Sequence, residues 1–225
     1  MSLTNTIVIF LGPPGAGKGS QARLLSRSYS WPFLPIGDTL RGISEQKSAI
    51  GHKVRRILAS GDLMDNEIIA EVVRTRTQNG DCADGYIIDG YPRNLNQAKW
   101  LDEWAVHQKK TVVAVYLSIP KEVVVTRVLG RRNCNICGEL FNTDTCPPTV
   151  SSLCDSCGNP LEQRKDDTPD ILKQRYRTFE LETLPLVEYY KRTERLIPLD
   201  GHQSVDFVFH DLKAALQGLG RKKRF

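Results

Sequence analysis

A glycine-rich segment near the start of the chain constrains the fold more than any other feature. It reads Gly12-Pro13-Pro14-Gly15-Ala16-Gly17-Lys18-Gly19-Ser20. A β-branched apolar run, Thr6 to Leu11, precedes it and predicts a buried strand, and a helical pattern from Gln21 to Ser28 follows it. In this context backbone N–H groups and the positive end of the helix bind phosphate oxygens, and Lys18 reaches the terminal phosphates. The segment therefore predicts a phosphate-binding loop (P-loop), with Gly19 where Ser or Thr usually follows the lysine.

The rest of the chain alternates between strand and helix patterns. Continuous apolar runs, typical of parallel strands covered on both faces, occur at Tyr86–Ile88 and Thr111–Leu117, with a weaker one at Arg195–Leu199. Helical patterns lie between or after them, at Asn66–Thr77, Leu95–His107, Lys121–Leu129, Pro169–Lys191 (one helix or two) and Val205–Leu216. The alternation predicts an α/β fold with a doubly wound parallel sheet.

Two stretches interrupt this alternation. Residues 38–64 are helical and polar and contain no strand pattern, whereas residues 131–167 are rich in Cys, Asn, Thr, Pro and Gly. We interpret both stretches as insertions, the second with its own stabilising device.

The net charge does not favour a nucleic acid partner. Residues Arg221, Lys222, Lys223 and Arg224 supply +4 of the formal net charge of +5, which leaves +1 for the rest of the chain. Such a terminal run is usually a solvated tail. The longest apolar stretch near the N-terminus, Ile7 to Leu11, is far too short to cross a bilayer, and no basic region precedes it as in a signal peptide. We expect no membrane association and a cytoplasmic location.

Further motifs follow the apolar or helical segments. They are Gly37-Asp38-Thr39-Leu40-Arg41, Asp89-Gly90-Tyr91-Pro92-Arg93 with Gln97 four residues later, Arg127 through Arg131-Arg132, and Gln163-Arg164-Lys165-Asp166-Asp167. Together with the P-loop they closely resemble the adenylate kinase family of nucleoside monophosphate kinases, from Ile7 to about Gln203. The resemblance implies a five-stranded parallel P-loop core (residues 1–36, 65–130 and 168–225), a helical monophosphate-binding segment (residues 37–64) and a lid (residues 131–167).

The resemblance also implies roles for individual residues. Transfer would depend on Lys18, Arg93, Arg131, Arg164 and Arg175. The residues implied for ATP are Gly15, Ala16, Gly17, Lys18, Gly19, Ser20, Arg127, Arg131, Leu140, Phe141 and Gln203. Those implied for AMP are Ile36, Arg41, Asp62, Leu63, Met64, Gly90, Tyr91, Pro92, Arg93, Gln97, Arg164 and Arg175. Asp38 and Asp89 would orient water around Mg²⁺.

The chemistry of such a transfer agrees with these residue types. The acceptor is a phosphate oxygen that is already deprotonated at neutral pH, so no general base is needed. The difficulty is the approach of two anions, which concentrated positive charge and positioning can overcome. Arginine suits this task because its planar guanidinium stays charged and makes paired hydrogen bonds. Plain hydrolysis of a nucleoside triphosphate would not need the acceptor motifs or the lid arginines.

Several residues bear on which bases the enzyme accepts. Ile36 stands where most adenylate kinases have a Thr that contacts the base, and Asn94 after Arg93 is more familiar from pyrimidine monophosphate kinases. Asn142 and Thr145 replace ring-bearing residues near the ATP adenine. Gln97 favours AMP, because its amide can both donate to and accept from an adenine edge. We expect a monomeric enzyme that converts ATP and AMP into two ADP, with UMP or CMP, or broad specificity, as the alternative.

Four cysteines form two paired motifs, Cys134-x2-Cys137-Gly138 and Cys154-x2-Cys157-Gly158. This spacing indicates a structural Zn²⁺ site with four thiolates, and two disulfides or free thiols are the alternatives. A zinc-binding segment of this kind could instead bind nucleic acid. This alternative is disfavoured, because residues 131–167 carry four basic and six acidic side chains. Cys146 is interpreted as a bystander thiol, and Cys82 indicates no function.

Overall fold

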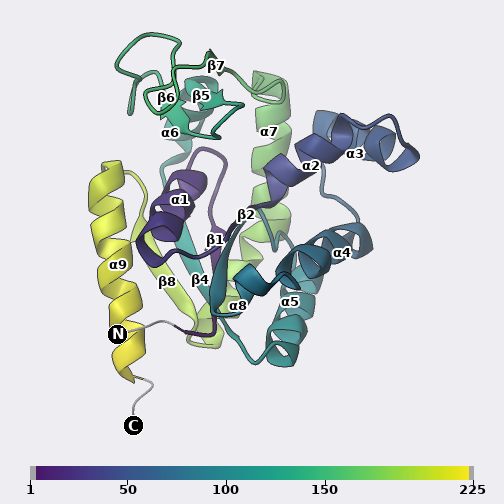
Figure 1. Cartoon of the computed structure of the whole chain (residues 1–225), viewed down its shortest axis with the longest axis vertical. Coiled ribbons are helices and arrows are strands. Elements are labelled where there is room, and N and C mark those ends of the chain that lie inside the picture. Colours follow the sequence, from purple (N-terminus) through teal and green to yellow (C-terminus); the bar gives the residue numbers. More distant parts are fainter. Residues whose placement is uncertain (1–3, 223–225) are drawn as a thin grey trace.

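A five-stranded parallel sheet forms the centre of the molecule (Figure 1), in a computed structural model that describes residues 4–222, with side chains through residue 219. The strand order is β2-β3-β1-β4-β8, and every neighbouring pair is parallel. The strands are β1 (Thr6–Leu11), β2 (Phe33–Pro35), β3 (Gly85–Asp89), β4 (Thr111–Ser118) and β8 (Leu196–Asp200). The predicted fold class is confirmed.

The helices are α1 (Lys18–Tyr29), α2 (Ile36–Ser44), α3 (Ala49–Ser60), α4 (Asn66–Thr77), α5 (Leu95–His107), α6 (Lys121–Leu129), α7 (Pro169–Thr178), α8 (Pro185–Arg192) and α9 (Val205–Lys222). Helices α1 and α9 pack on one face of this sheet and α4, α5 and α8 on the other, and the remaining helices lie toward or within the insertions (Figure 1). A 3₁₀ turn, η1, covers Gly80–Cys82, and a π-helical turn, η2 (Phe179–Thr183), joins α7 to α8. The predicted helix over Pro169–Lys191 is therefore two helices.

The core is divided by the alternation of side chains along β1. Val8 and Phe10 face a cluster that includes Leu25 of α1 and Leu212 of α9. The intervening residues Ile7, Ile9 and Leu11 face the opposite cluster, which includes Val73 of α4, Leu101 of α5 and Leu186 of α8. Burial of each such side chain contributes about 1.5–3 kcal/mol. Because both faces are covered, β1 is apolar at nearly every position, as a central parallel strand requires.

Strand β2 has no counterpart among the strands that the sequence pattern identifies. It is three residues long, pairs only with β3, and ends at Pro35. An edge strand tolerates proline because one row of its N–H groups needs no partner in the sheet. Because β2 is so short, its residues do not form the long apolar run that identifies β1 and β4.

The two insertions project from the core (Figure 1). Helices α2 and α3 occupy most of the first, and a small antiparallel sheet, β5 (Arg131–Cys134), β6 (Leu140–Asn142) and β7 (Leu161–Glu162), occupies the second. This small sheet has the order β6-β5-β7 and a minimal core of Cys134, Phe141, Cys154 and Leu161.

Within residues 4–222, no helix has the length and apolar character needed to span a membrane. The basic tail falls outside the described side chains, since those of Arg221 and Lys222 are not described and residues 223–225 are not described at all.

Candidate active site

A cleft of about 700 Å³ lies at the carboxyl ends of the central strands, between the P-loop and the lid. In an open parallel sheet this edge is the usual site for ligands. All eleven residues implied for ATP line the cleft, from Gly15 of the P-loop to Gln203 before α9. The structure thus brings the predicted donor-site residues together.

The P-loop is arranged to receive phosphate. Helix α1 begins at Lys18, its N-cap Gly17 has a φ of 87°, and its first turn contains no acidic residue. The Lys18 ammonium donates hydrogen bonds to the carbonyl oxygens of Gly12 (2.8 Å) and Pro13 (2.7 Å). Burial lowers the pKa of Lys18 to about 8, against the opposing effect of Asp89. The loop therefore holds a desolvated ammonium group, whose positive charge a bound phosphate would stabilise.

Gly19 is explained by its neighbours. A Cβ atom at this position would lie 3.1 Å from the Leu140 methyl group and 3.3 Å from the Asp89 carboxylate. A Ser or Thr immediately after the lysine would push against both. The glycine lets the lid residue Leu140 approach the loop, and Ser20 supplies the hydroxyl one residue later.

Ion pairs between arginines and aspartates connect the lid, α7 and the monophosphate-binding segment. Arg131 pairs with Asp167 (2.8 Å) and Arg164 pairs with Asp38 (2.9 Å). Arg175 contacts both Asp166 (3.2 Å) and Asp167 (3.3 Å), while Arg41 pairs with Asp38 and, at 3.5 Å, with Asp166. The Asp167 side chain is fully buried. These partners hold the arginines in one place before any substrate arrives.

The charge states follow from this network. Burial would raise the pKa of Asp38, but Arg164 and Arg41 outweigh it and lower the pKa. Burial and the nearby Arg131 lower the pKa of Arg164 and Arg175 to about 10, so both stay charged at neutral pH. The cleft therefore presents fixed positive charge to a phosphate.

The two aspartates implied for Mg²⁺ differ in their surroundings. Asp38 is engaged by Arg41 and Arg164. The Asp89 carboxylate, at the end of β3, forms no hydrogen bond or ion pair with any other described residue, and it lines the cleft. Its position beside Gly19 and Ser20 fits a role next to a cation on the donor phosphates.

The residues implied for AMP divide into two groups. Those implied for its phosphate, Arg41, Arg93, Arg164 and Arg175, line the cleft together with Leu63, Gly90 and Pro92. Ile36, Met64, Tyr91 and Gln97 are buried away from it, and Asp62 accepts a hydrogen bond from Gln174 of α7 at 3.2 Å. The structure thus gathers the predicted phosphate ligands but not the predicted base ligands.

Gln97 is held inside the protein, with 2% of the residue exposed. Its amide oxygen accepts from the Arg93 backbone N–H (2.7 Å), and its amide nitrogen donates to the Asn66 side-chain oxygen (3.0 Å). Asn94 is the N-cap of α5, and its side-chain oxygen accepts from the Gln97 backbone N–H at 2.9 Å. Capping alone is a sufficient reason for Asn94, so this residue gives no information about the acceptor base.

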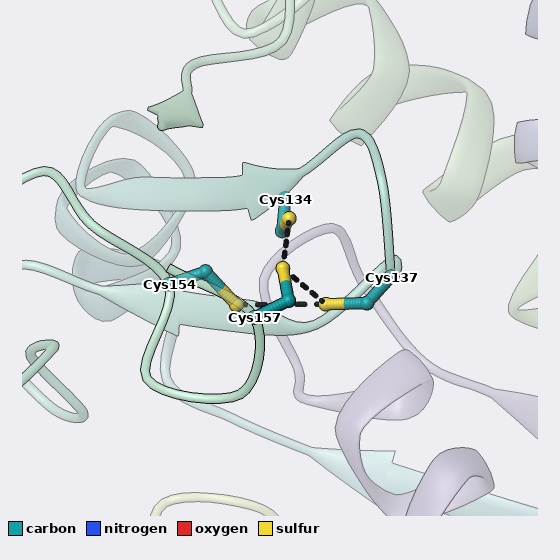
Figure 2. A group of neighbouring side chains, drawn as sticks. All are labelled: Cys134, Cys137, Cys154 and Cys157. Atoms are coloured by element: carbon teal, nitrogen blue, oxygen red, sulfur yellow. Dashed lines mark hydrogen bonds between the residues drawn. The ribbon is translucent and has the colours of Figure 1, made fainter. Parts of the chain in front are cut away.

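The four motif cysteines converge in the lid (Figure 2). Their sulfur atoms lie within 4.8 Å of one another, with 3.5 Å between the sulfurs of Cys134 and Cys157 and between those of Cys137 and Cys154. A tetrahedral zinc–thiolate site requires sulfur separations of about 3.8 Å. Gly138 and Gly158 have φ of 74° and 70°, the left-handed turns expected after each pair. None of the six cysteines is in a disulfide.

Hydrogen bonds within the cluster shift the pKa values of Cys137 and Cys157 in opposite directions, upward for Cys137 and downward for Cys157. Hydrogen bonds from the side chain and the backbone of Asn159 lower the pKa of Cys157 to about 6. A thiolate is the form that binds zinc. The four-thiol donor set and its spacing fit Zn²⁺. By contrast, Cys82 is buried in the main core, and burial raises its pKa to about 11.

Several cleft residues have no predicted role. Arg23, Arg27 and Glu139 line it near the lid, and Cys146 lines it beside Thr145. Asp166 and Asp167 belong to a recognised motif, but their pairing with Arg131 and Arg175 is a tertiary contact that spacing along the chain does not reveal.

Comparison with known proteins agrees with this geometry. The adenylate kinase family model matches residues 10–195. An adenylate kinase of Fervidobacterium nodosum is 42% identical over 96% of this chain and 99% of that protein. Adenylate kinases of Clostridium acetobutylicum (39% identical, 93% of this chain and 98% of that protein) and Caldanaerobacter subterraneus (37%, 94% and 96%) are similar over nearly their whole length. The chain is a phosphotransferase and belongs to the adenylate kinase family.

Proposed function

We propose that this chain catalyses the reversible transfer of the terminal phosphoryl group of Mg-ATP to AMP, giving two ADP. One observation carries the proposal. Lys18 and five arginines (Arg41, Arg93, Arg131, Arg164 and Arg175) line a single cleft, although they come from the P-loop, both insertions, α7 and the end of β3. This density of positive charge suits two polyanions that must approach each other.

Each group of residues has a separate task in the proposed reaction. The P-loop N–H groups and Lys18 hold the donor phosphates, while Arg41 and Arg93 hold the acceptor phosphate. Arg131, Arg164 and Arg175 lie between the two and stabilise the charge that builds up on the transferring group. The acceptor oxygen is already deprotonated, so no residue has to remove a proton.

Mg²⁺ bound with ATP would neutralise charge on the donor phosphates. Asp89 and Asp38, with the hydroxyl of Ser20, are the residues proposed to orient its water shell. Asp89 is the better placed, because its carboxylate lines the cleft and has no competing protein partner among the described residues. Asp38 would have to share its oxygens with Arg41 and Arg164.

We further propose that residues 37–64 and 131–167 close on substrates as separate parts around a core of residues 1–36, 65–130 and 168–225. The lid's own three-stranded sheet and small core support this division, and the ion pairs of Asp38 with Arg164 and of Arg41 with Asp166 are where the two insertions meet. Zn²⁺ on Cys134, Cys137, Cys154 and Cys157 would stabilise a lid whose apolar core is very small.

A coupled assay with Mg-ATP and each of AMP, GMP, CMP and UMP tests the proposed function. AMP should give the highest kcat/KM. Faster turnover of CMP or UMP would instead identify a pyrimidine nucleotide kinase. The structure is compatible with that alternative, because Ile36 is buried and the Gln97 amide is hydrogen-bonded to Asn66.

Two arginine variants sharpen the assay. Arg93→Ala should lose about 3–4 kcal/mol of transition-state stabilisation, a loss of two to three orders of magnitude in kcat/KM. Arg192→Ala is the matched control, because Arg192 is an exposed residue of α8 outside the cleft. Near-normal turnover by Arg93→Ala, with an unchanged melting temperature, would contradict the assigned site.

We also propose that the enzyme is a monomer in the cytoplasm. The six unpaired cysteines support a reducing compartment. Sedimentation of the zinc-loaded protein tests the monomeric state directly.

A further inference from the structure

Helix α1 contacts the lid at a point outside the arginine–aspartate network. Arg27, on the last turn of α1, forms an ion pair of 2.5 Å with Glu139 of the lid. Arg23, one turn earlier, lies against Gly138, where a Cβ atom would be only 2.7 Å from its guanidinium. Gly138 and Glu139 directly follow Cys137, so α1 contacts the turn at the end of the first cysteine pair.

The same lid segment continues into the donor site. Leu140 comes directly after Glu139 and approaches Gly19 of the P-loop, and Phe141 lines the cleft beside it. A contact that fixes Glu139 therefore also fixes Leu140 over the donor phosphates. The pairing of Arg164 with Asp38 cannot replace it, because that pair joins the lid to the monophosphate-binding segment instead.

Arg23 adds a second feature to this side of α1. Its guanidinium forms no ion pair with a described residue, its Nε atom is buried without a hydrogen-bond partner, and it lies over the ring of Phe33 at 5.3 Å. Arg23 and Arg27 thus both contact the lid, Arg23 at Gly138 and Arg27 through its ion pair with Glu139.

We propose that Arg27 and Glu139 are positioning residues that dock the lid on α1 and so set how tightly the enzyme holds ATP. This inference rests on the proposed function and extends it to the closure of the donor site. The docked lid favours bound ATP, whereas the acceptor phosphate is held mainly by Arg41 and Arg93 and depends less on this contact.

The structure bounds the size of the effect. The Arg27 side chain is 62% exposed and that of Glu139 is 21% exposed. An exposed ion pair is worth up to about 1 kcal/mol, which corresponds to a factor of about five in the lid equilibrium. Reversing one charge adds repulsion, so the KM for ATP should rise about fivefold or more, while kcat at saturating ATP should change less than about twofold.

Charge reversal and charge exchange test the proposal in the zinc-loaded full chain. Arg27→Glu and Glu139→Arg should each raise the KM for ATP, and the double variant should restore it. The increase should shrink in high salt, because exposed charges are screened. Arg192→Glu, which reverses a charge in the exposed Arg192–Glu188 pair of α8, should leave the KM for ATP unchanged.

Two measurements separate docking from a loss of structure. Zinc content and melting temperature should match those of the parent protein in all four variants, and rescue by charge exchange would not follow from damage to the fold. A KM for ATP that stays unchanged in Arg27→Glu, or a double variant no better than the single ones, would overturn the proposal. Failure of the parent protein to phosphorylate AMP would instead overturn the proposed function.

Discussion

Lys18 should give the donor site a distinctive pH dependence. Burial lowers its pKa from 10.5 to about 8 in the ligand-free protein, a difference that corresponds to about 3 kcal/mol. Bound donor phosphates should raise this pKa again, because they place negative charge around the ammonium. The free enzyme therefore loses the proton on Lys18 at a lower pH than the enzyme with bound ATP.

The sign of the effect is fixed by which form binds phosphate. Protonated Lys18 is the active form, so kcat/KM for ATP should fall as the pH rises through about 8, by up to tenfold per pH unit. The kcat profile reports the bound enzyme and should stay level to a higher pH. Steady-state kinetics between pH 6 and 10 at saturating AMP would measure both profiles.

The corresponding stability change has the opposite sense. The buried ammonium destabilises the ligand-free fold when it is charged, so this residue's contribution to the free energy of unfolding should increase between pH 8 and 10.5. Comparison with Lys18→Met isolates this contribution from other groups that titrate there. A kcat/KM profile that is level through pH 9.5, or kcat and kcat/KM falling at the same pH, would refute the reasoning.

Three further perturbations test other parts of the structure. Zinc removal by a chelator should lower the melting temperature of the lid yet leave some transferase activity in the cold, because the four-cysteine site has no open ligand position. Metal analysis of freshly reduced protein should find one zinc per chain. In denaturant titrations Asp167→Ala should destabilise the ligand-free protein by about 3–5 kcal/mol, because Arg131 and Arg175 lose a buried partner. A non-hydrolysable ATP analogue should recover part of this loss. Leu101→Ala, in the fully buried core beside α4 and α8, should cost about 2–5 kcal/mol in the same titrations without changing the KM for ATP.

The sequence predicted those helices and strands whose hydrophobic pattern reflects how they are buried in the core. Helices α4, α5 and α6 have the predicted bounds, and β1 and β4 agree within one residue. These segments either repeat apolar residues with helical spacing or are apolar throughout. Strand β2 and the three lid strands were missed, because strands of two to four residues at an edge or in a small sheet show no such pattern.

Sequence motifs predict the placement of a residue best where its neighbours along the chain set its position. The P-loop and the cysteine pairs are local motifs, so their spacing alone brings Lys18 beside Gly12 and predicts four sulfurs in one cluster. Gln97 depends on a different kind of information. Its partner Asn66 is 31 residues away along the chain, and no spacing rule relates the two.

The engagement of Gln97 bears on how an acceptor could bind. Its amide already uses one donor and one acceptor, for Asn66 and for the Arg93 backbone, and each of its two polar atoms has capacity for one more hydrogen bond. The same two contacts fix which way the amide faces, with oxygen toward Arg93 and nitrogen toward Asn66. Because Gln97 is buried and does not line the cleft, an acceptor base can reach this amide only if the surrounding structure rearranges. Arg93 thus connects the two halves of acceptor binding: its guanidinium faces the phosphate cleft, and its backbone N–H holds the amide proposed to read the base.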